Sequence, residues 1–154
     1  MVSGKTAIGV VVKDKELVMS QRSSDRMEWS MAFVDTSLTN YNYETDAKTD
    51  FNGKTNTATI IAEDSNNVAA KYCNGYTTAG TSAGDWYLPA VGELYHYVYG
   101  NYNAINTAMT SIGWVLNTAV LWSSSESDDI NRVWGMNTSN GSVITYLKDF
   151  SYYV

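Results

Sequence analysis

Apolar residues recur with strand-like spacing near both ends of the chain and with helix-like spacing in the middle. Near the N-terminus, residues 7–12 and 16–21 are β-branched or apolar runs that predict two strands, and the Lys-Asp-Lys of residues 13–15 suits a hairpin turn between them. Residues 36–56 then shift to Thr, Asn, Asp, Tyr and Gly. This composition predicts a long loop, with a turn at Asn52-Gly53.

The middle of the chain carries apolar residues at helical spacing. Residues 57–75 predict one helix that ends at Gly75. Pro89 suits the first turn of a second helix, because its missing N–H would have no helical partner there, and this helix is expected to end at Gly100. A third helix is expected over residues 103–111.

Strand signals return after the helices. Residues 119–122, 132–136, 143–147 and 152–154 are rich in β-branched and aromatic residues, and Asn140-Gly141 is a strong hairpin turn signal. Strands, then helices, then strands predict an α+β fold, with two or three helices packed on small twisted antiparallel sheets. We expect a single domain over residues 1–154, standing alone or as the C-terminal module of a longer protein.

Charge and cysteine content narrow the function classes. The net charge of −6 argues against a nucleic-acid partner, because phosphate binding needs a clustered basic face. No apolar run approaches the roughly 20 residues that span a bilayer, so no membrane insertion is expected. Cys73 is the one cysteine, which rules out an internal disulfide. Residues 1–5 lack the apolar core of a signal peptide.

The residues needed for nucleophilic catalysis or zinc binding are scarce. His96 is the one histidine, and Cys73 lies on the apolar side of the first expected helix, where a free cysteine usually packs as a small hydrophobe. One histidine and one cysteine cannot build a zinc site. Asp128, Asp129 and Asn131 could offer oxygen ligands to calcium, but they lack the spacing of a calcium loop. We therefore expect neither a metal nor another cofactor, and interpret these three residues as a polar loop.

Two carboxylates leave an enzymatic alternative open. Glu93 and Glu126 each flank a tryptophan-containing motif, and a glycosidase needs two carboxyl groups about 5–10 Å apart across a cleft. Spacing along a chain does not reveal that distance. Glu93 also lies in a first helical turn, where the helix dipole alone favours an acidic residue.

The C-terminal segment, residues 127–154, is the part most typical of a binding surface. Fifteen of its 28 residues are Ser, Asn, Asp, Thr or Tyr. These residue types dominate antibody paratopes, where Tyr supplies contact area and the small polar residues supply adaptable hydrogen bonds. The alternative is that they are merely the solvent-facing positions of half-buried strands.

Two motifs resemble those of a bacterial and phage domain family with a C-type-lectin-like fold. GDWYLPAVGEL at residues 84–94 is similar to the family's W-x-L-P-x-x-x-E-L signature, and LWSSSE at residues 121–126 is similar to its W-S-S-[ST]-E signature. The resemblance covers residues 84–93 and 121–148 well and the rest loosely. It implies that Trp86, Trp122 and Trp134 are mostly buried. The Trp-Asn-Asp motif of calcium lectins is absent.

The C-terminal segment also resembles the variable regions of proteins diversified by retroelements, a group that includes phage tropism determinants. By that resemblance Trp122, Val133, Trp134, Gly141 and Lys148 are a fixed scaffold. Strand alternation adds Ile144 to the outward set and turns Thr145 inward, against its place among the variable positions. The expected ligand-binding residues are Ser127, Asp128, Asp129, Asn131, Met136, Asn137, Ser139, Ser142, Ile144, Thr145, Tyr146, Asp149, Phe150 and Tyr152.

These observations predict a ligand-binding or receptor-binding module with no catalytic activity. Its expected partner is a protein or glycan on a cell surface, and its expected location is extracellular, on a cell surface or on a phage particle. Two alternatives stay open: a carbohydrate-active enzyme or lectin-type glycan binder, and a structural fimbrial or phage tail subunit.

Overall fold

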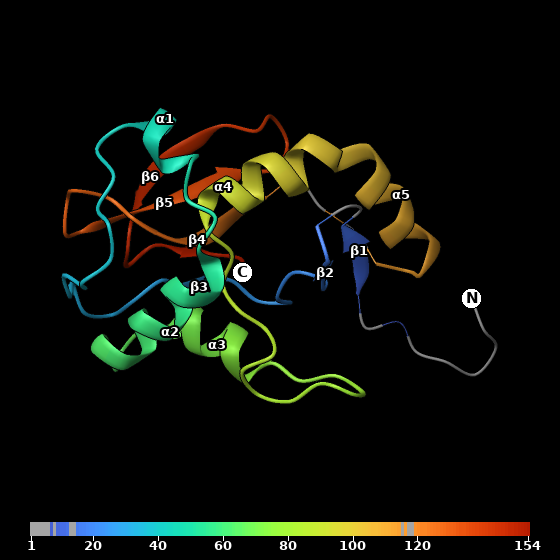
Figure 1. Cartoon of the computed structure of the whole chain (residues 1–154), viewed down its shortest axis with the longest axis horizontal. Helices are drawn as coiled ribbons and strands as arrows, with labels where there is room; N and C mark the ends of the chain where they lie inside the picture. The colour runs from blue at the N-terminus through green and yellow to red at the C-terminus, as the bar shows by residue number, and fades with distance from the viewer. Residues whose placement is uncertain (1–6, 8, 13–14, 115, 117–118) are drawn as a thin grey trace.

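A three-stranded antiparallel sheet forms the centre of the molecule. The computed structural model describes residues 7, 9–12, 15–114, 116 and 119–154. Within them the central sheet has the order β4-β5-β6, and its strands are β4 (Val120–Glu126), β5 (Arg132–Asn137) and β6 (Val143–Leu147) (Figure 1). The turn between β5 and β6 contains Gly141 at φ 72°, a backbone conformation that favours glycine, so the predicted Asn140-Gly141 turn is confirmed.

Helices cover both faces of this sheet, which makes the fold α+β, as predicted. On one side lie α2 (Gly53–Glu63) and α3 (Val68–Gly75). On the other lies a continuous helical run. It begins as α4 (Val91–Glu93), passes through the π-helical turn η1 (Leu94–Val98) and the 3₁₀ turn η2 (Tyr99–Asn101), and ends as α5 (Tyr102–Ser111) (Figure 1). No helix in the described ranges is long and apolar enough to cross a bilayer.

Strand alternation divides the core into two clusters, one on each face of the sheet. Trp122 and Val133 pack with Trp29 and Ile60 on the α2–α3 side. Trp134, Met136 and Val143 pack with Leu94 and Ile105 on the side of the long helical run. Trp122 and Trp134 are buried as expected, whereas Trp86 is partly exposed. Trp29 is also fully buried, which was not predicted from the sequence. Burial of one large apolar side chain stabilises a fold by about 1.5–3 kcal/mol.

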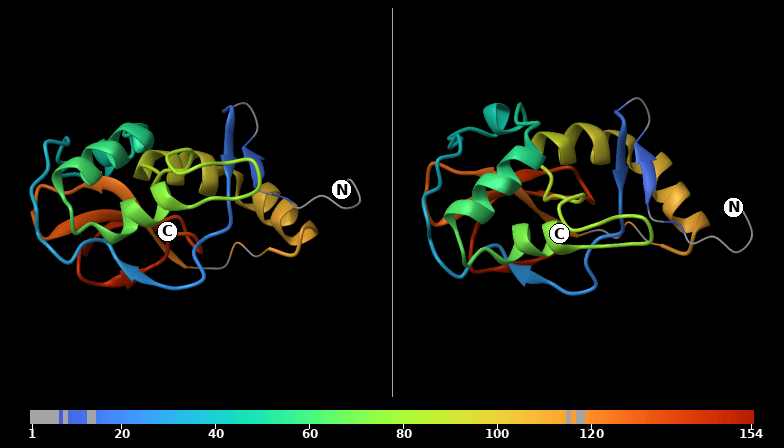
Figure 2. Two further views of the ribbon diagram at one scale, coloured as in Figure 1. Left: turned by 90° about the horizontal axis from the view of Figure 1, so that it is seen from below. Right: turned by 60° about the horizontal axis from the view of Figure 1, so that its bottom comes forward.

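Two short strand pairs and a four-residue helix complete the fold. β1 (Val10–Val12) pairs with β2 (Leu17–Met19), and this hairpin packs beside α5 (Figure 2). β3 (Met27–Glu28) pairs with β7 (Ser151–Tyr152), and the next residue, Tyr153, bridges to β4. The helix α1 (Glu44–Ala47) lies within the stretch predicted to be a loop. Residues 8, 13 and 14, part of the expected first strand and its turn, lie outside the described residues.

The helix predicted over residues 57–75 is two helices, because polar side chains between them bind the backbone. Asp64 Oδ1 accepts a hydrogen bond from the Asn66 amide (2.9 Å), and its Oδ2 accepts one from Ser30 Oγ (2.5 Å). Asn67 then caps α3 by accepting a hydrogen bond from the Ala70 amide (2.8 Å). Such local bonds compete with the helical ladder. The helical spacing of apolar residues continues across this break, which is why the sequence predicted one helix instead of two.

Two further helix boundaries differ from the prediction. Gly53 is the first residue of α2 rather than a turn residue, so α2 begins four residues before Thr57. A Cβ at Gly53 would lie 2.2 Å from Glu93 Oε2, which means that this helix start packs directly against α4. Gly100 does not end a helix: it lies in the 3₁₀ turn that bends the long run toward α5. A single glycine weakens a helix but does not break one whose apolar face is buried.

The three serines of LWSSSE join β4 to the segment that contains Pro89. The register between β4 and β5 shifts between Trp122 and Glu126, so these serines form an irregular stretch of the strand. The Ser124 amide donates to the Pro89 carbonyl (2.9 Å), and Ser125 Oγ accepts from the Val91 amide (2.9 Å). Ser123 Oγ donates to the Trp134 carbonyl (2.6 Å). The two sequence motifs therefore fit one another through the hydrogen bonds of Ser124 and Ser125 to the backbone of Pro89 and Val91.

Candidate functional site

The structure removes two residues from the expected binding face. Met136 is fully buried in the core on the helical-run side of the sheet, and Ser127 is 5% exposed. Met136 points inward because it pairs with Val143, a core residue, in the β5–β6 register. Ser127 is buried where the chain leaves β4. Neither side chain is available to a ligand, so the prediction for these two positions is corrected.

Three further residues lie apart from the others. Asn137, Ser139 and Ser142 are at the β5–β6 turn, whereas Asn131 precedes the opposite end of β5. Six residue-to-residue steps along β5 separate Asn131 from Asn137, a length of roughly 20 Å. The turn residues also bond to one another, since Asn137 Oδ1 accepts from the amide and the hydroxyl of Ser139. The expected residues thus form two groups rather than one face.

The larger of the two groups of expected residues contains a cluster of aromatic side chains on one face of the sheet. Tyr146 and Tyr152 contact one another with ring centroids 4.8 Å apart, and Tyr152 lies 4.9 Å from Trp122 beneath. Phe150 extends the cluster, 6.4 Å from Tyr152. Phe150 and Ile144 are each 49% exposed, while the two tyrosines are half-buried. Burial raises the pKa of Tyr146 above its usual value. We call Ile144, Tyr146, Phe150 and Tyr152 the aromatic face.

The register explains which side chains belong to this face. Ile144 pairs with Gly135, and Tyr146 pairs with Val133, which places both on the Trp122 side of the sheet. Gly135 leaves room for Tyr146, because a Cβ there would lie 3.0 Å from the tyrosine ring. Thr145 pairs with Trp134 and so points to the opposite side, as strand alternation predicted.

A buried ion pair lies behind the aromatic face. Lys148 Nζ is 2.6 Å from Glu126 Oε1, with both side chains 2% exposed or less. Lys148 Nζ also donates to the Val34 carbonyl (3.1 Å) and lies 4.7 Å from the centre of the Trp29 ring. Glu126 Oε2 accepts a further hydrogen bond from Thr36 Oγ1 (2.5 Å). Such a pair is stable only where additional hydrogen bonds offset the desolvation of both charges, as they do here.

An acidic rim borders the aromatic face. Asp128, Asp129, Asn131 and Asp149 are all exposed. Asp129 Oδ1 accepts from the Asn131 amide (3.0 Å), and this bond, with the nearby Arg132 guanidinium at 3.5 Å, lowers the pKa of Asp129. No group of three or more His, Cys, Asp or Glu side chains in the described part of the chain could hold a metal ion.

The two carboxylates of the enzymatic alternative are engaged in structural contacts. Glu93 Oε2 accepts from the Ala90 amide (2.8 Å) at the start of α4, and Oε1 accepts from the Tyr87 hydroxyl (3.1 Å). Burial raises the pKa of Glu93 above its ordinary value of 4.5. Glu126 is the partner of Lys148. Each carboxylate therefore holds its own neighbours in place.

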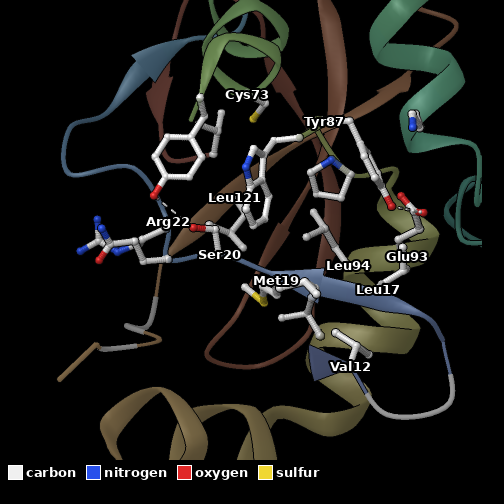
Figure 3. A pocket seen from close by; sticks show the side chains of 18 of the residues that line it. Val12, Leu17, Met19, Ser20, Arg22, Cys73, Tyr87, Glu93, Leu94 and Leu121 are labelled. Carbon is white, nitrogen blue, oxygen red and sulfur yellow. Dashed lines mark hydrogen bonds between the residues drawn. The ribbon is translucent and has the colours of Figure 1, made fainter. Parts of the chain in front are cut away.

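A hollow that the sequence did not indicate lies between β2 and the segment from Tyr76 to Pro89 (Figure 3). Its volume is about 540 Å³, and its walls are mainly apolar and aromatic. Cys73 points into it, but burial raises the pKa of this thiol to about 12, so it is not a nucleophile near neutral pH. His96 is exposed and contacts Phe51 and Tyr95. Glu93, whose pKa is raised, and Tyr87 also line the hollow, so it holds one carboxyl group of the enzymatic alternative.

Sequence reasoning missed a loop that borders the acidic rim. Met31 is 75% exposed and Phe33 is 44% exposed, and both lie in the segment that follows β3. The apolar run Met31-Ala32-Phe33-Val34 was the available signal, but it could not place these residues beside others about a hundred positions later.

Comparison with known proteins gives no relative. No protein-family model matches the chain, and neither a curated protein nor a solved structure does.

Proposed function

We propose that this chain is a non-enzymatic recognition module with a C-type-lectin-like fold, and that its C-terminal segment binds a protein or glycan on a cell surface. We further propose that the exposed positions of this segment tolerate diversification of the kind made by retroelements. The observation that carries the proposal is the aromatic face. Exposed Phe150 contacts partly buried Tyr152 and is preceded by the exposed carboxylate of Asp149, and exposed Ile144 lies two residues before Tyr146 on the same face of the sheet. An apolar centre with a polar rim is typical of binding surfaces.

The rigid base of the face supports the proposal. Tyr146 and Tyr152 contact each other and Trp122, so they have little side-chain entropy left to lose on binding. A surface that is ordered before its ligand arrives binds more tightly for the same contacts. The buried Lys148–Glu126 pair holds the adjoining loops to the sheet in the same way.

The experiment compares two double variants in the folded domain. Ile144→Ser with Phe150→Ser removes the exposed centre of the face, and Tyr43→Ser with Phe51→Ser removes exposed aromatic residues elsewhere as the control. Labelled protein is tested for binding to a panel of bacterial cells and a glycan array. We expect the wild type and the control to bind a shared target, and the face variant to lose at least tenfold in affinity.

Three outcomes would contradict the proposal. Unchanged binding by the face variant would place recognition elsewhere on the molecule. Hydrolysis of a panel glycan, with activity lost in Glu93→Gln, would favour the carbohydrate-active enzyme. Spontaneous polymers of the purified wild type would favour the structural fimbrial or tail subunit.

A further inference from the structure

Exposed apolar side chains gather at the end of the molecule where three loops meet. They are Met31 and Phe33 in residues 30–36, Ile130 in residues 127–131, and Phe150 in residues 148–150. Their exposed fractions range from 44% to 75%. We call these four residues and their loops the three-loop end, which lies on the left of the molecule in Figure 1. Clusters of exposed large apolar side chains mark interaction sites more often than single ones do.

Lys148 joins all three loops through hydrogen bonds. Its carbonyl accepts from the amides of Trp29 (2.9 Å) and Ser30 (3.2 Å), and its Nζ donates to the Val34 carbonyl (3.1 Å). Its amide donates to the Asn131 carbonyl (2.9 Å). Residues 30–36 are therefore fixed beside the C-terminal segment by bonds that span more than a hundred positions. They belong to the same surface although they lie outside the segment expected to vary.

The charge of the three-loop end is negative. Asp35, Asp128, Asp129 and Asp149 are exposed there. Asp129 is paired with Arg132, and no ion pair within the described residues involves the other three. Lys148 is buried against Glu126 and does not offset them. Uncompensated surface charge of one sign attracts a partner of the other and sets the rate of encounter.

We infer that the partner of this module is a cationic protein segment that places a bulky apolar side chain among the exposed apolar residues of the three-loop end. This inference rests on the proposed function and adds the chemical class of the partner and a second contributing loop. Lysine or arginine side chains of the partner pair with Asp35, Asp128 and Asp149. Neutral glycans fit this surface less well, because they would leave the carboxylates unpaired.

The test uses a phage-displayed library of random dodecapeptides selected against the whole wild-type chain. Enriched peptides are expected to carry net positive charge and at least one aromatic residue or leucine. Their affinity is expected to fall at least tenfold in the variant with Asp35→Asn, Asp128→Asn and Asp149→Asn. The control variant, with Asp25→Asn, Asp46→Asn and Asp85→Asn, loses the same charge from exposed positions elsewhere and is expected to bind like the wild type.

A second comparison separates this inference from the proposed function. Met31→Ser with Phe33→Ser alters only the added loop and is expected to weaken the same peptides at least fivefold. If binding requires Ile144 and Phe150 but neither Met31 and Phe33 nor the three carboxylates, the inference is wrong and the proposed function stands. Selection of neutral or acidic peptides, equal losses in the two charge variants, enrichment of no peptide, or binding to neutral glycans alone would each overturn it.

Discussion

Lys148 shows how far a single side chain can depend on partners that are distant in the sequence. Resemblance placed it in the fixed scaffold, but its partners could not be predicted, because Glu126 lies 22 positions away and Val34 lies 114 positions away. The serines of LWSSSE are a similar case, because Ser125 Oγ bonds to the Val91 amide 34 positions away. The sequence therefore singled out these residues but not their partners.

The first prediction concerns the buried ion pair. Lys148→Met leaves the Glu126 carboxylate buried without its cation, and loss of one partner of such a pair costs about 3–5 kcal/mol of unfolding free energy. Urea denaturation measures the loss. The double variant Lys148→Met with Glu126→Leu removes both charges and should recover most of it. A double variant no more stable than the single one would show that the pair is not the cause.

The second prediction concerns the pH dependence of stability. The pKa of Glu93 is raised in the folded state above its ordinary value of 4.5, mainly by burial. As the pH rises from 4.5 through the raised pKa, the unfolded chain releases this proton before the folded one does, so Glu93 contributes progressively less stability. In Glu93→Gln this contribution is absent. Urea titrations between pH 4.5 and 7.5 should show that the free energy of unfolding declines less steeply with pH in the variant than in the wild type. Parallel plots of unfolding free energy against pH would contradict the assignment.

The strands were easier to predict from the sequence than the helix boundaries. β6 has the predicted bounds, and β4 and β5 were located to within a few residues, because β-branched runs bounded by a turn signal are local patterns. The break between α2 and α3 depends on Asp64 bonding to Ser30, a distant residue. The strand predicted over residues 152–154 overlaps β7 at Tyr152, whereas β3, with two residues, is too short for any periodicity and exists because it pairs with β7.

The third prediction tests the contact that begins α2. Gly53→Ala places a Cβ 2.2 Å from Glu93 Oε2 and 2.7 Å from the Ala90 nitrogen, so either the helix or the cap of α4 must move. Overpacking of this kind costs about 1–3 kcal/mol. Gly75→Ala is the matched control, because nothing lies within 4 Å of the added atom, and it should be neutral or slightly stabilising. Thermal unfolding measures the difference, and equal melting temperatures for the two variants would contradict the prediction.

At the scale of the whole molecule, the fold class followed from the order of its elements, whereas the proposed binding surface followed only in part. Strands, helices and strands in succession gave the α+β class. The turn residues Asn137 and Ser139 were grouped with Asp128 because sequence distance does not show that β5 separates them. Met31 and Phe33 were missed for the opposite reason, since the fold brings them beside a segment that follows a hundred residues later.

The claim that the C-terminal segment serves recognition rather than folding can be tested without a ligand. Six exposed positions, Asp128, Asp129, Asn131, Ile144, Asp149 and Phe150, are randomised together in a library displayed on yeast. Resistance to protease then measures the fraction of members that stay folded. Substitution at an exposed position usually changes stability by about 0.5 kcal/mol or less, so we predict that most members resist protease nearly as well as the wild type. If most members are cleaved like an unfolded chain, these side chains belong to the fold, and the recognition surface is not where we place it.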